Sequence, residues 1–426
     1  MRHVRALLFS LGLLLVGPVA SAAEVVDPGE ETKKPPAGPA PNAGTPDRPV
    51  TVGILPSFAF NLDDGIGLGA WGDVRGDALE GEARRHRWNM GLNLKLWLKV
   101  RQVGWQIQVG LSTFPDASGD REVQVSVTTL GRPRDWWFGL GMDAARDRRF
   151  VQEDDPVPDL RHRFGLYRGR ISGHVFQRLA GPLSAFVGGK FSHHAVQVTP
   201  DTLLSETVDQ HRGTTGGPTF SVDVGLRVDA RDARVDPTSG GYLVALAQAN
   251  LGPGDPWTRL LFDLRGFLPI ADAKLVLAAE ALVQAALGDV PFYEQSVLAG
   301  WDANERSVTG VLGLRAMDRG RLRGPLGALG HVEVRVRPPG FRLFPKLFVR
   351  LAPAAWVDVA RVDELDRAPV DALPLQPSFG GGVRLFVNEV SSARLDIGTG
   401  PERILDADGE RTRWTFGIYG NVGHAF

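Results

Sequence analysis

The feature that most constrains the fold of this 426-residue chain is a two-residue alternation of apolar and polar side chains. In the segment 273–287, Leu275 and Leu277 share one parity, whereas Lys274 and Glu280 share the other. The same alternation recurs along most of the chain after residue 50. Successive side chains of a β-strand point to opposite faces. The pattern therefore predicts an all-β fold whose strands have one apolar face and one polar face.

The alternation alone does not separate two classes of β protein. In a soluble sandwich the apolar face packs into a core, whereas in a membrane barrel it contacts lipid and the polar face lines a lumen. The expected strands are commonly about 11–15 residues long, which fits a membrane barrel better than the roughly 5–6 residues of globular strands. Trp136 and Trp257 lie at segment ends, as aromatic membrane-interface belts require. We therefore predict a transmembrane barrel.

The end of the chain supports the same class. Trp414, Phe416 and Phe426 share one face of the last expected strand. A terminal aromatic residue that closes an amphipathic strand resembles the recognition signal of outer-membrane barrels. After Val50 no apolar run reaches the roughly 18 residues that a membrane helix requires. We expect the protein to lie in the bacterial outer membrane, in contact with its lipid.

Strand counting tests the prediction, because bacterial barrels have an even number of strands and both chain ends on one side. We predict a 16-stranded antiparallel transmembrane β-barrel with strands at 51–61, 65–77, 86–99, 102–114, 121–137, 161–178, 182–198, 217–231, 240–252, 257–269, 273–287, 326–338, 344–359, 374–388, 391–400 and 411–426. The longer outer loops are expected at 138–160, 199–216, 288–325, 360–373 and 401–410. Short periplasmic connections are expected at 179–181, 269–273 and 388–390. Long loops thus fall on alternate connections, as this topology requires.

The first 49 residues predict export. A positive head, Met1–Arg5, precedes the apolar run Ala6–Val19 and the small-residue step Ala20-Ser21-Ala22. These are the three parts of a signal peptide, residues 1–22, with cleavage expected after Ala22. Residues 23–49 are rich in Pro, Gly and Ala, so we expect a disordered linker before a barrel at 50–426.

Composition excludes several kinds of chemistry. Lys and Arg total 48 against 49 Asp and Glu, so the basic surplus typical of nucleic-acid binding is missing. The absence of cysteine excludes disulfides, thiolate zinc sites and thiol nucleophiles. His193 and His194, with Asp201 and Glu206 beyond them, could suggest a metal or protease site, but adjacent strand residues point to opposite faces. We expect no enzyme, no metal and no cofactor.

The outer loop 288–325 is the strongest candidate for a functional element. Loops longer than about 12–15 residues are usually functional or disordered. This loop carries five arginines, namely Arg306, Arg315, Arg319, Arg321 and Arg323. Glu333 and Asp358 fall on the lumen-facing parity of later strands, and a guanidinium fork suits a carboxylate. We expect the loop to fold into the lumen and dock there; the alternative is that these charges solvate a water-filled pore.

Several stretches carry a family resemblance over residues 50–426. They are Leu55–Gly65, the aspartate-rich turn Asp229–Tyr242, Gly330–Glu333, Val357–Val362, Ser378–Leu385 and Ala393–Gly398. In this order and spacing they resemble the barrel of the BamA/TamA family of outer-membrane proteins, also called bacterial surface antigens. The resemblance implies an arginine at the tip of the sixth loop that pairs with acidic residues of the two following strands.

Arg315 takes the place of that arginine, although Ala316 and Met317 replace the usual Gly and aromatic residue. Arg323-Gly324 is a competing alignment, and Arg265-Gly266-Phe267 sits in mid-strand, where a loop tip cannot form. The predicted loop-docking cluster, listed in full, is Arg315, Arg319, Arg323, Glu333 and Asp358.

The resemblance also implies a function. Members of the family insert or translocate polypeptides by pairing a client strand at an openable seam between the first and last strands. Here the seam would lie between Phe58 and Phe60 on one side and Phe416 and Ile418 on the other. The expected partners are an unfolded or secreted client and a separate periplasmic protein, because the linker 23–49 leaves no room for delivery domains. The alternative is a passive channel or structural barrel without lateral opening.

Overall fold

The computed structural model describes residues 50–61, 65–79, 82–99, 102–115, 119–148, 160–252, 254–295, 297–298, 306–310, 312–344, 347–364, 375–387 and 391–422. The expected signal peptide, the linker 23–49 and Phe426 lie outside the described residues. For Phe58 and Phe60 only the backbone is described.

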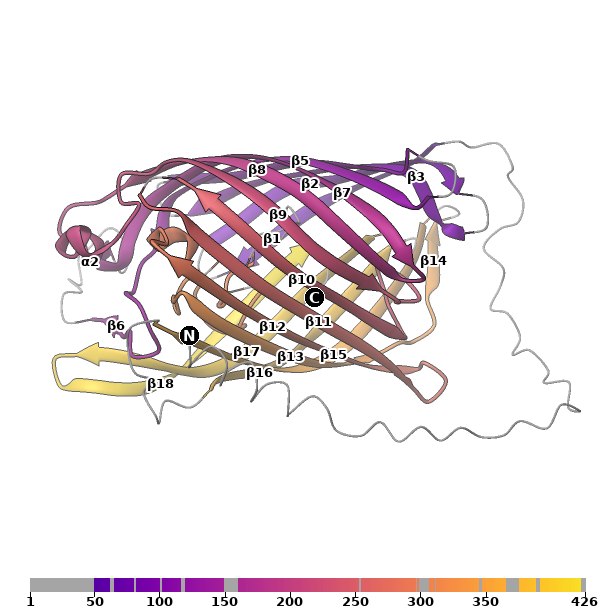
Figure 1. Ribbon diagram of the computed structural model, residues 1–426. Coiled ribbons are helices and arrows are strands. Elements are labelled where there is room, and N and C mark those ends of the chain that lie inside the picture. The colour runs from indigo at the N-terminus through magenta and orange to yellow at the C-terminus, as the bar shows by residue number, and fades with distance from the viewer. Residues whose placement is uncertain are drawn as a thin grey trace, which may run out of the picture. The chain divides into compact units, whose positions relative to one another are not determined.

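Within the described residues, eighteen strands belong to one sheet (Figure 1). The long strands are β1 (Val50–Asn61), β2 (Gly65–Leu79), β3 (Glu82–Lys99), β4 (Gln102–Thr113), β5 (Arg121–Trp136), β7 (Arg163–Ala180), β8 (Leu183–Gln197), β9 (Gly217–Asp229), β10 (Gly240–Leu251), β11 (Trp257–Ile270), β12 (Leu275–Gly288), β13 (Leu326–Val336), β15 (Leu347–Asp363), β16 (Gln376–Val387), β17 (Ser391–Asp406) and β18 (Gly409–Val422). The two short strands are β6 (Arg146–Asp147) and β14 (Phe341–Phe344).

Helical structure is confined to short segments in the loops. They are η1 (Leu160–His162), α2 (Leu203–Glu206), η2 (Val208–Gln210) and η3 (Phe292–Glu294). No helix in this part of the chain is long and apolar enough to cross a membrane.

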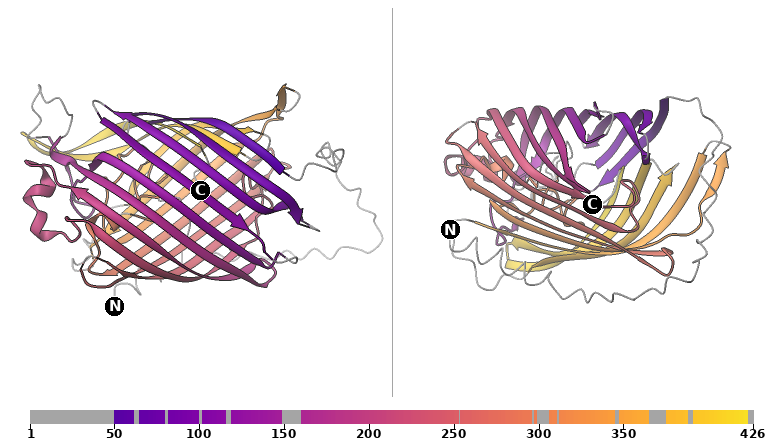
Figure 2. Two further views of the ribbon diagram at one scale, coloured as in Figure 1. Left: turned by 90° about the horizontal axis from the view of Figure 1, so that it is seen from above. Right: turned by 45° about the vertical axis from the view of Figure 1, so that its right-hand side comes forward.

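The long strands form a single antiparallel wall. Each pairs with the next long strand in sequence, from β1 with β2 through β17 with β18. The strands run obliquely and the wall curves round (Figure 2), so that β1 lies beside β18. The predicted antiparallel barrel of sixteen long strands is therefore confirmed.

The two faces of the wall are inverted relative to a soluble protein. On β9, Val222 and Val224 are more than half exposed on the outer face, whereas Asp223 is completely buried on the inner face. Arg259 on β11 and Glu280 on β12 are likewise buried, next to exposed neighbours such as Leu260. A charged interior and an apolar exterior are what hydrocarbon around the barrel and an enclosed lumen require.

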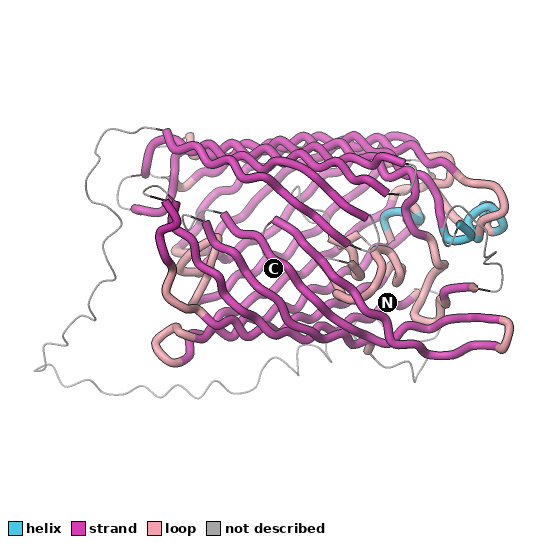
Figure 3. Tube along the Cα trace, turned by 180° about the vertical axis from the view of Figure 1, so that it is seen from behind, coloured by secondary structure: helices cyan, strands magenta, loops and turns pink. Residues whose placement is uncertain are grey.

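The outer end of the wall differs from the prediction at three strands. The loop expected at 401–410 is wrong, because β17 and β18 continue as a hairpin that closes at residues 407–408. Backbone pairing explains the extension: Ile404 and Leu405 of β17 form a parallel ladder with Arg146 and Asp147 of β6, where β16 no longer covers this edge. β15 similarly runs to Asp363, into the loop expected at 360–373. The helical segments and this hairpin gather at one end of the barrel (Figure 3).

The opposite end carries the short connections. The turns lie at 181–182 between β7 and β8 and at 271–274 between β11 and β12, close to the predicted positions. The connection expected at 388–390 lies outside the described residues. An additional strand, β14, stands between β13 and β15, where only a short connection was expected.

The exposed apolar face predicts a specific sensitivity to charge. Val224 lies midway along β9 and is 51% exposed. Val224→Arg should destabilise the barrel by about 2–4 kcal/mol, the range for a basic residue at the bilayer midplane. The measurement is urea unfolding of the protein in lipid vesicles, with Val224→Leu as the control of similar size. Equal unfolding midpoints for the two variants would contradict the assignment of this face to lipid.

Candidate functional site

The described residues of the sixth loop, between β12 and β13, lie inside the barrel. Its apolar side chains Val308, Leu314, Met317 and Leu322 are buried in one cluster with residues of the wall. Its arginines Arg306, Arg315, Arg321 and Arg323 are also buried. A loop in water would leave such groups hydrated, so these side chains depend on partners supplied by the lumen wall.

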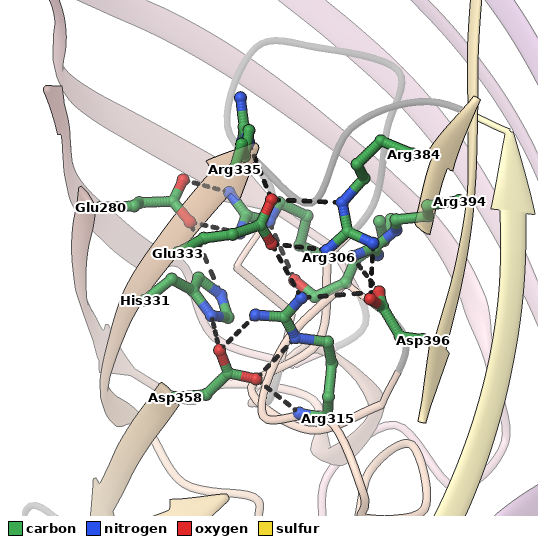
Figure 4. Close-up of polar contacts among 11 residues, drawn as sticks. Glu280, Arg306, Arg315, His331, Glu333, Arg335, Asp358, Arg384, Arg394 and Asp396 are labelled. Atoms are coloured by element: carbon green, nitrogen blue, oxygen red, sulfur yellow. Dashed lines mark hydrogen bonds and ion pairs between the residues drawn. The ribbon is translucent and has the colours of Figure 1, made fainter. Parts of the chain in front are cut away.

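Arg315 makes the central contact of this loop (Figure 4). Its Nε and Nη2 donate to the two carboxylate oxygens of Asp358 on β15, at 2.8 and 2.6 Å. Its backbone N–H also donates to Asp358, at 3.1 Å, and Nη1 donates to Glu333 on β13 at 3.2 Å. The planar fork therefore bridges two neighbouring strands, a geometry that a lysine ammonium cannot reproduce.

The same guanidinium also stacks on an aromatic ring. The Arg315 Cζ lies 3.8 Å from the centre of the Trp356 ring. Gly380 and Gly398 stand level with Trp356 on the next two strands, and a Cβ at either position would collide with the indole. The two glycines thus make the space in which Trp356 lies flat under Arg315, and stacking adds a cation–π contribution.

The network extends from Glu333 to the late strands. Glu333 also accepts hydrogen bonds from Arg335 at 2.8 Å and from Arg384 at 2.6 Å. Arg384 donates in addition to Asp396 at 2.6 Å, and Arg394 donates to the same carboxylate at 3.2 Å. Each carboxylate therefore faces more than one cation, so charge is compensated across the group rather than pair by pair.

A second set of contacts, on the other side of Asp358, also joins the sixth loop to the wall. The His331 Nδ1 is 2.7 Å from Asp358, and its Nε2 is 3.6 Å from Glu280 on β12. Glu280 in turn accepts two hydrogen bonds from Arg306 of the loop, at 2.5 and 2.6 Å. Arg306 and Arg315 thus hold the loop to β12, β13 and β15 through one continuous set of charges.

The other predicted loop arginines do not join this cluster. Arg319 donates to Asp135 on β5 at 2.7 Å, and Arg323 donates to the carbonyl oxygen of Trp136 at 2.8 Å. The structure therefore brings Arg315, Glu333 and Asp358 together and places Arg319 and Arg323 at the outer end of the barrel. Of the two alternative loop-tip arginines, Arg315 is the one beside both acidic residues. Arg265 remains in the wall, where it pairs with Asp263.

The first part of the loop is held by a separate charged group. Glu294 of η3 accepts a hydrogen bond from Arg259 at 2.7 Å and lies 3.7 Å from Arg170 and 3.5 Å from His194. Burial alone would raise the pKa of Glu294, but Arg259 and Arg170 outweigh it and lower that pKa to about 2. Glu294 consequently stays ionised and anchors the loop throughout the physiological range.

The last strand is tied to the loop tip. The Thr415 hydroxyl donates to the carbonyl oxygen of Ala316 at 2.8 Å, and the Tyr419 hydroxyl donates to that of Met317 at 3.4 Å. Of the other residues singled out on β18, Trp414 and Phe416 are exposed, and Ile418 is half-buried. The loop therefore connects β18 to the Arg315 cluster.

Sequence reasoning missed Asp396, Arg384, His331 and the pair Glu280–Arg306. All lie on the polar parity of their strands or in the loop, and His331 and Asp396 fall within the family-like stretches 330–333 and 393–398. Strand parity shows that such residues face the lumen, but not which of them meet across it.

The residues considered for catalysis do not converge. His193 is exposed, whereas His194 is buried and stacks on Tyr293 with ring centres 4.4 Å apart. Among the described residues no group of three His, Cys, Asp or Glu side chains could hold a metal ion. The arrangement of charges is suited to holding a loop.

No family model matches the chain, and no curated protein matches it by sequence. Solved structures share its fold. BamA from Haemophilus ducreyi lacking POTRA domains 1–3 aligns with a TM-score of 0.52 at 12% identity, over 88% of this chain and 70% of that one. CdiB from Acinetobacter baumannii aligns with a TM-score of 0.51 at 14% identity, over 88% of this chain, and CdiB from Escherichia coli with 0.51 at 13%, over 89%.

The chain spans 60% and 64% of the two CdiB chains. At these identities the likeness concerns the fold. It confirms that the barrel has the fold found in BamA and CdiB, as expected from the resemblance to the BamA/TamA family.

Removing the Asp358 carboxylate should release the sixth loop from the wall. Asp358→Ala removes three hydrogen bonds from Arg315 and leaves the guanidinium with Glu333 and Asp396. Breaking a fully buried pair costs about 3–5 kcal/mol, so the loop should detach and trypsin should cleave after Arg315. Limited digestion followed by mass spectrometry measures this.

A matched control exists on the same strand. Asp363 accepts hydrogen bonds from Arg361 at a partly exposed position, where a pair is worth about 0–1 kcal/mol. Asp363→Ala should therefore leave the digestion pattern unchanged. If Asp358→Ala is digested no faster than Asp363→Ala, the docking described above is contradicted.

Proposed function

We propose that this protein inserts or translocates polypeptides at the outer membrane by opening sideways between β1 and β18. One observation carries the proposal. Every other pair of neighbouring long strands forms an antiparallel ladder, whereas no ladder joins β1 to β18 within the described residues, although the two lie side by side.

Such a boundary is a physically suitable place for a client strand. The two edges present backbone donors and acceptors that an extended polypeptide can pair with, as in β-augmentation. Pro56 removes one N–H from β1. Gly417 and Gly420 leave two positions of β18 without side chains that could pack across the boundary. We expect these features to make the two strands easier to separate.

The docked loop favours a sideways opening over a passive channel. The buried arginines of the sixth loop and their carboxylates occupy the lumen. A passive channel would need that space for water and solute. The loop also holds β18 through Ala316 and Met317, so it keeps one edge of the boundary fixed while the other separates.

The remaining parts of the proposal concern partners. The client is an unfolded or secreted polypeptide, and a separate periplasmic protein delivers it. The outer membrane supplies the lipid into which the boundary opens. The proposal includes no enzymatic step and no cofactor.

Cysteine crosslinking tests the opening directly, because the chain has no cysteine of its own. Phe58→Cys with Ile418→Cys places one thiol on each side of the boundary, and a short bis-maleimide joins them. The measurement is the rate at which a urea-unfolded small outer-membrane barrel protein folds into vesicles that contain the variant. Crosslinking should abolish the acceleration given by the uncrosslinked variant.

The matched control is Ile397→Cys with Ile418→Cys, which joins residues already paired in the β17–β18 ladder. Crosslinking this pair should leave the acceleration intact. Unchanged acceleration after the β1–β18 crosslink, or no acceleration by any form together with steady ion conductance in planar bilayers, would favour a passive channel and contradict the proposal.

A further inference from the structure

A buried histidine joins the short strand β6 to the end of β5. His162, the last residue of η1, is only 1% exposed. Its Nε2 accepts a hydrogen bond from the backbone N–H of Asp147 on β6, at 2.9 Å. Its Nδ1 lies 3.0 Å from the carbonyl oxygen of Trp137, the residue directly after β5. One imidazole ring therefore bridges β6 and the end of β5.

These two contacts specify the protonation state of the ring. The Asp147 N–H can only donate, so the His162 Nε2 must offer a lone pair to it. The Trp137 carbonyl oxygen can only accept, so Nδ1 must carry the proton. Neutral imidazole meets both conditions. In imidazolium both nitrogens are donors, so Nε2–H would face the N–H of Asp147. Protonation therefore removes one hydrogen bond and sets two donors against each other.

The carboxylates near His162 are already engaged with arginines. Asp147 accepts a hydrogen bond from Arg161 of η1 at 3.3 Å, and Arg161 also donates to Glu206 of α2 at 2.7 Å. Arg146 of β6 donates to Glu402 of β17 at 3.1 Å. A positive charge on His162 would therefore meet carboxylates that are already paired. The other titratable and charged groups near this ring are Arg163 of β7, His211 after η2, and Asp318 and Arg323 of the sixth loop.

β6 in turn supports the outer half of the β17–β18 hairpin (Figure 1). Arg146 and Asp147 form a parallel ladder with β17, and the Arg148 N–H donates to the carbonyl oxygen of Leu405 at 2.7 Å. β6 has only two residues, so its position depends on contacts beyond this ladder. The Asp147 N–H supplies one of them through His162. His162 thus secures β6, and β6 secures the hairpin.

We propose that His162 is a pH-sensitive switch: protonation of its ring releases β6 from the end of β5 and frees the outer half of the β17–β18 hairpin. An unperturbed histidine is half protonated at about pH 6.5, so the change falls in the mildly acidic range. The neutral ring holds Asp147 at neutral and alkaline pH, and the contact is lost as the pH falls. The switch concerns the outer hairpin alone and goes beyond the proposed function.

Hydrogen exchange followed by mass spectrometry tests the switch in the full-length protein in vesicles. Exchange is compared at neutral and mildly acidic pH after correction for its intrinsic pH dependence. The reporting peptides contain residues 146–148 and 404–406, and residues 260–267 of β11, which have ladders on both sides, are the internal reference. Exchange of the reporting peptides should accelerate about tenfold for each pH unit below the titration of His162, because only the released form binds the proton.

Two substitutions separate His162 from other titrating groups. His162→Gln retains an acceptor for the Asp147 N–H but cannot gain a charge, so its corrected exchange should be the same at both pH values. His162→Asn replaces it should that variant fail to fold. His211→Gln is the matched control: His211 packs against the Trp137 ring with centres 4.7 Å apart, and burial lowers its pKa, but its contact is with that ring rather than with β6. This control should keep the full acid response.

Two results would overturn the proposal. In the first, the corrected exchange of residues 146–148 in the unsubstituted protein is the same at neutral and acidic pH. In the second, acid accelerates exchange as much in His162→Gln as in the unsubstituted protein, which would assign the response to a carboxylate such as Asp147 or Glu402. Neither result depends on whether β1 and β18 separate.

Discussion

The structure depends on the burial of an arginine between two carboxylates inside a membrane barrel. Arg315 is almost fully buried, and its fork engages Asp358 and Glu333 from neighbouring strands. Removing ions from water costs several kcal/mol each, and only well-directed hydrogen bonds repay that cost. The same contacts that satisfy the guanidinium therefore determine where the sixth loop lies. Through Ala316 and Met317 the loop determines what β18 contacts.

Two environments, hydrocarbon outside and the lumen inside, determine which side chains each face of the wall carries and where the loop can lie. Hydrocarbon selects the apolar outer face, so the lumen receives the charged side chains and becomes the place where a polar loop can be held. Further contacts between loops and strands lie at the outer end, such as Arg319 with Asp135 and Arg321 with Glu402. The described residues of the sixth loop lie in the lumen, and the boundary between β1 and β18 is the part of the described wall without a ladder. In the function proposed above, this boundary is where a client would enter.

Residue parity predicted most of the fold and about half of the site. The alternation located all sixteen long strands, because lipid and lumen impose opposite demands on adjacent residues. It placed Glu333 and Asp358 on the inner face, and the family resemblance indicated Arg315. It did not find Asp396 or Glu280 as partners, since which inner residues meet depends on how the wall curves and where the loop enters. It also missed β14 and the long β17–β18 hairpin, because these depend on edge pairing and surroundings at the barrel ends rather than on alternation.

The most direct test of this account is a double-mutant cycle between Arg315 and Asp358, with unfolding free energies measured in lipid vesicles for Arg315→Met, Asp358→Leu and the double variant. The account predicts strong coupling of about 2–3 kcal/mol, because either single change leaves an incompletely paired buried charge. Changes that add to within about 0.5 kcal/mol would contradict it, since the two side chains would then act independently.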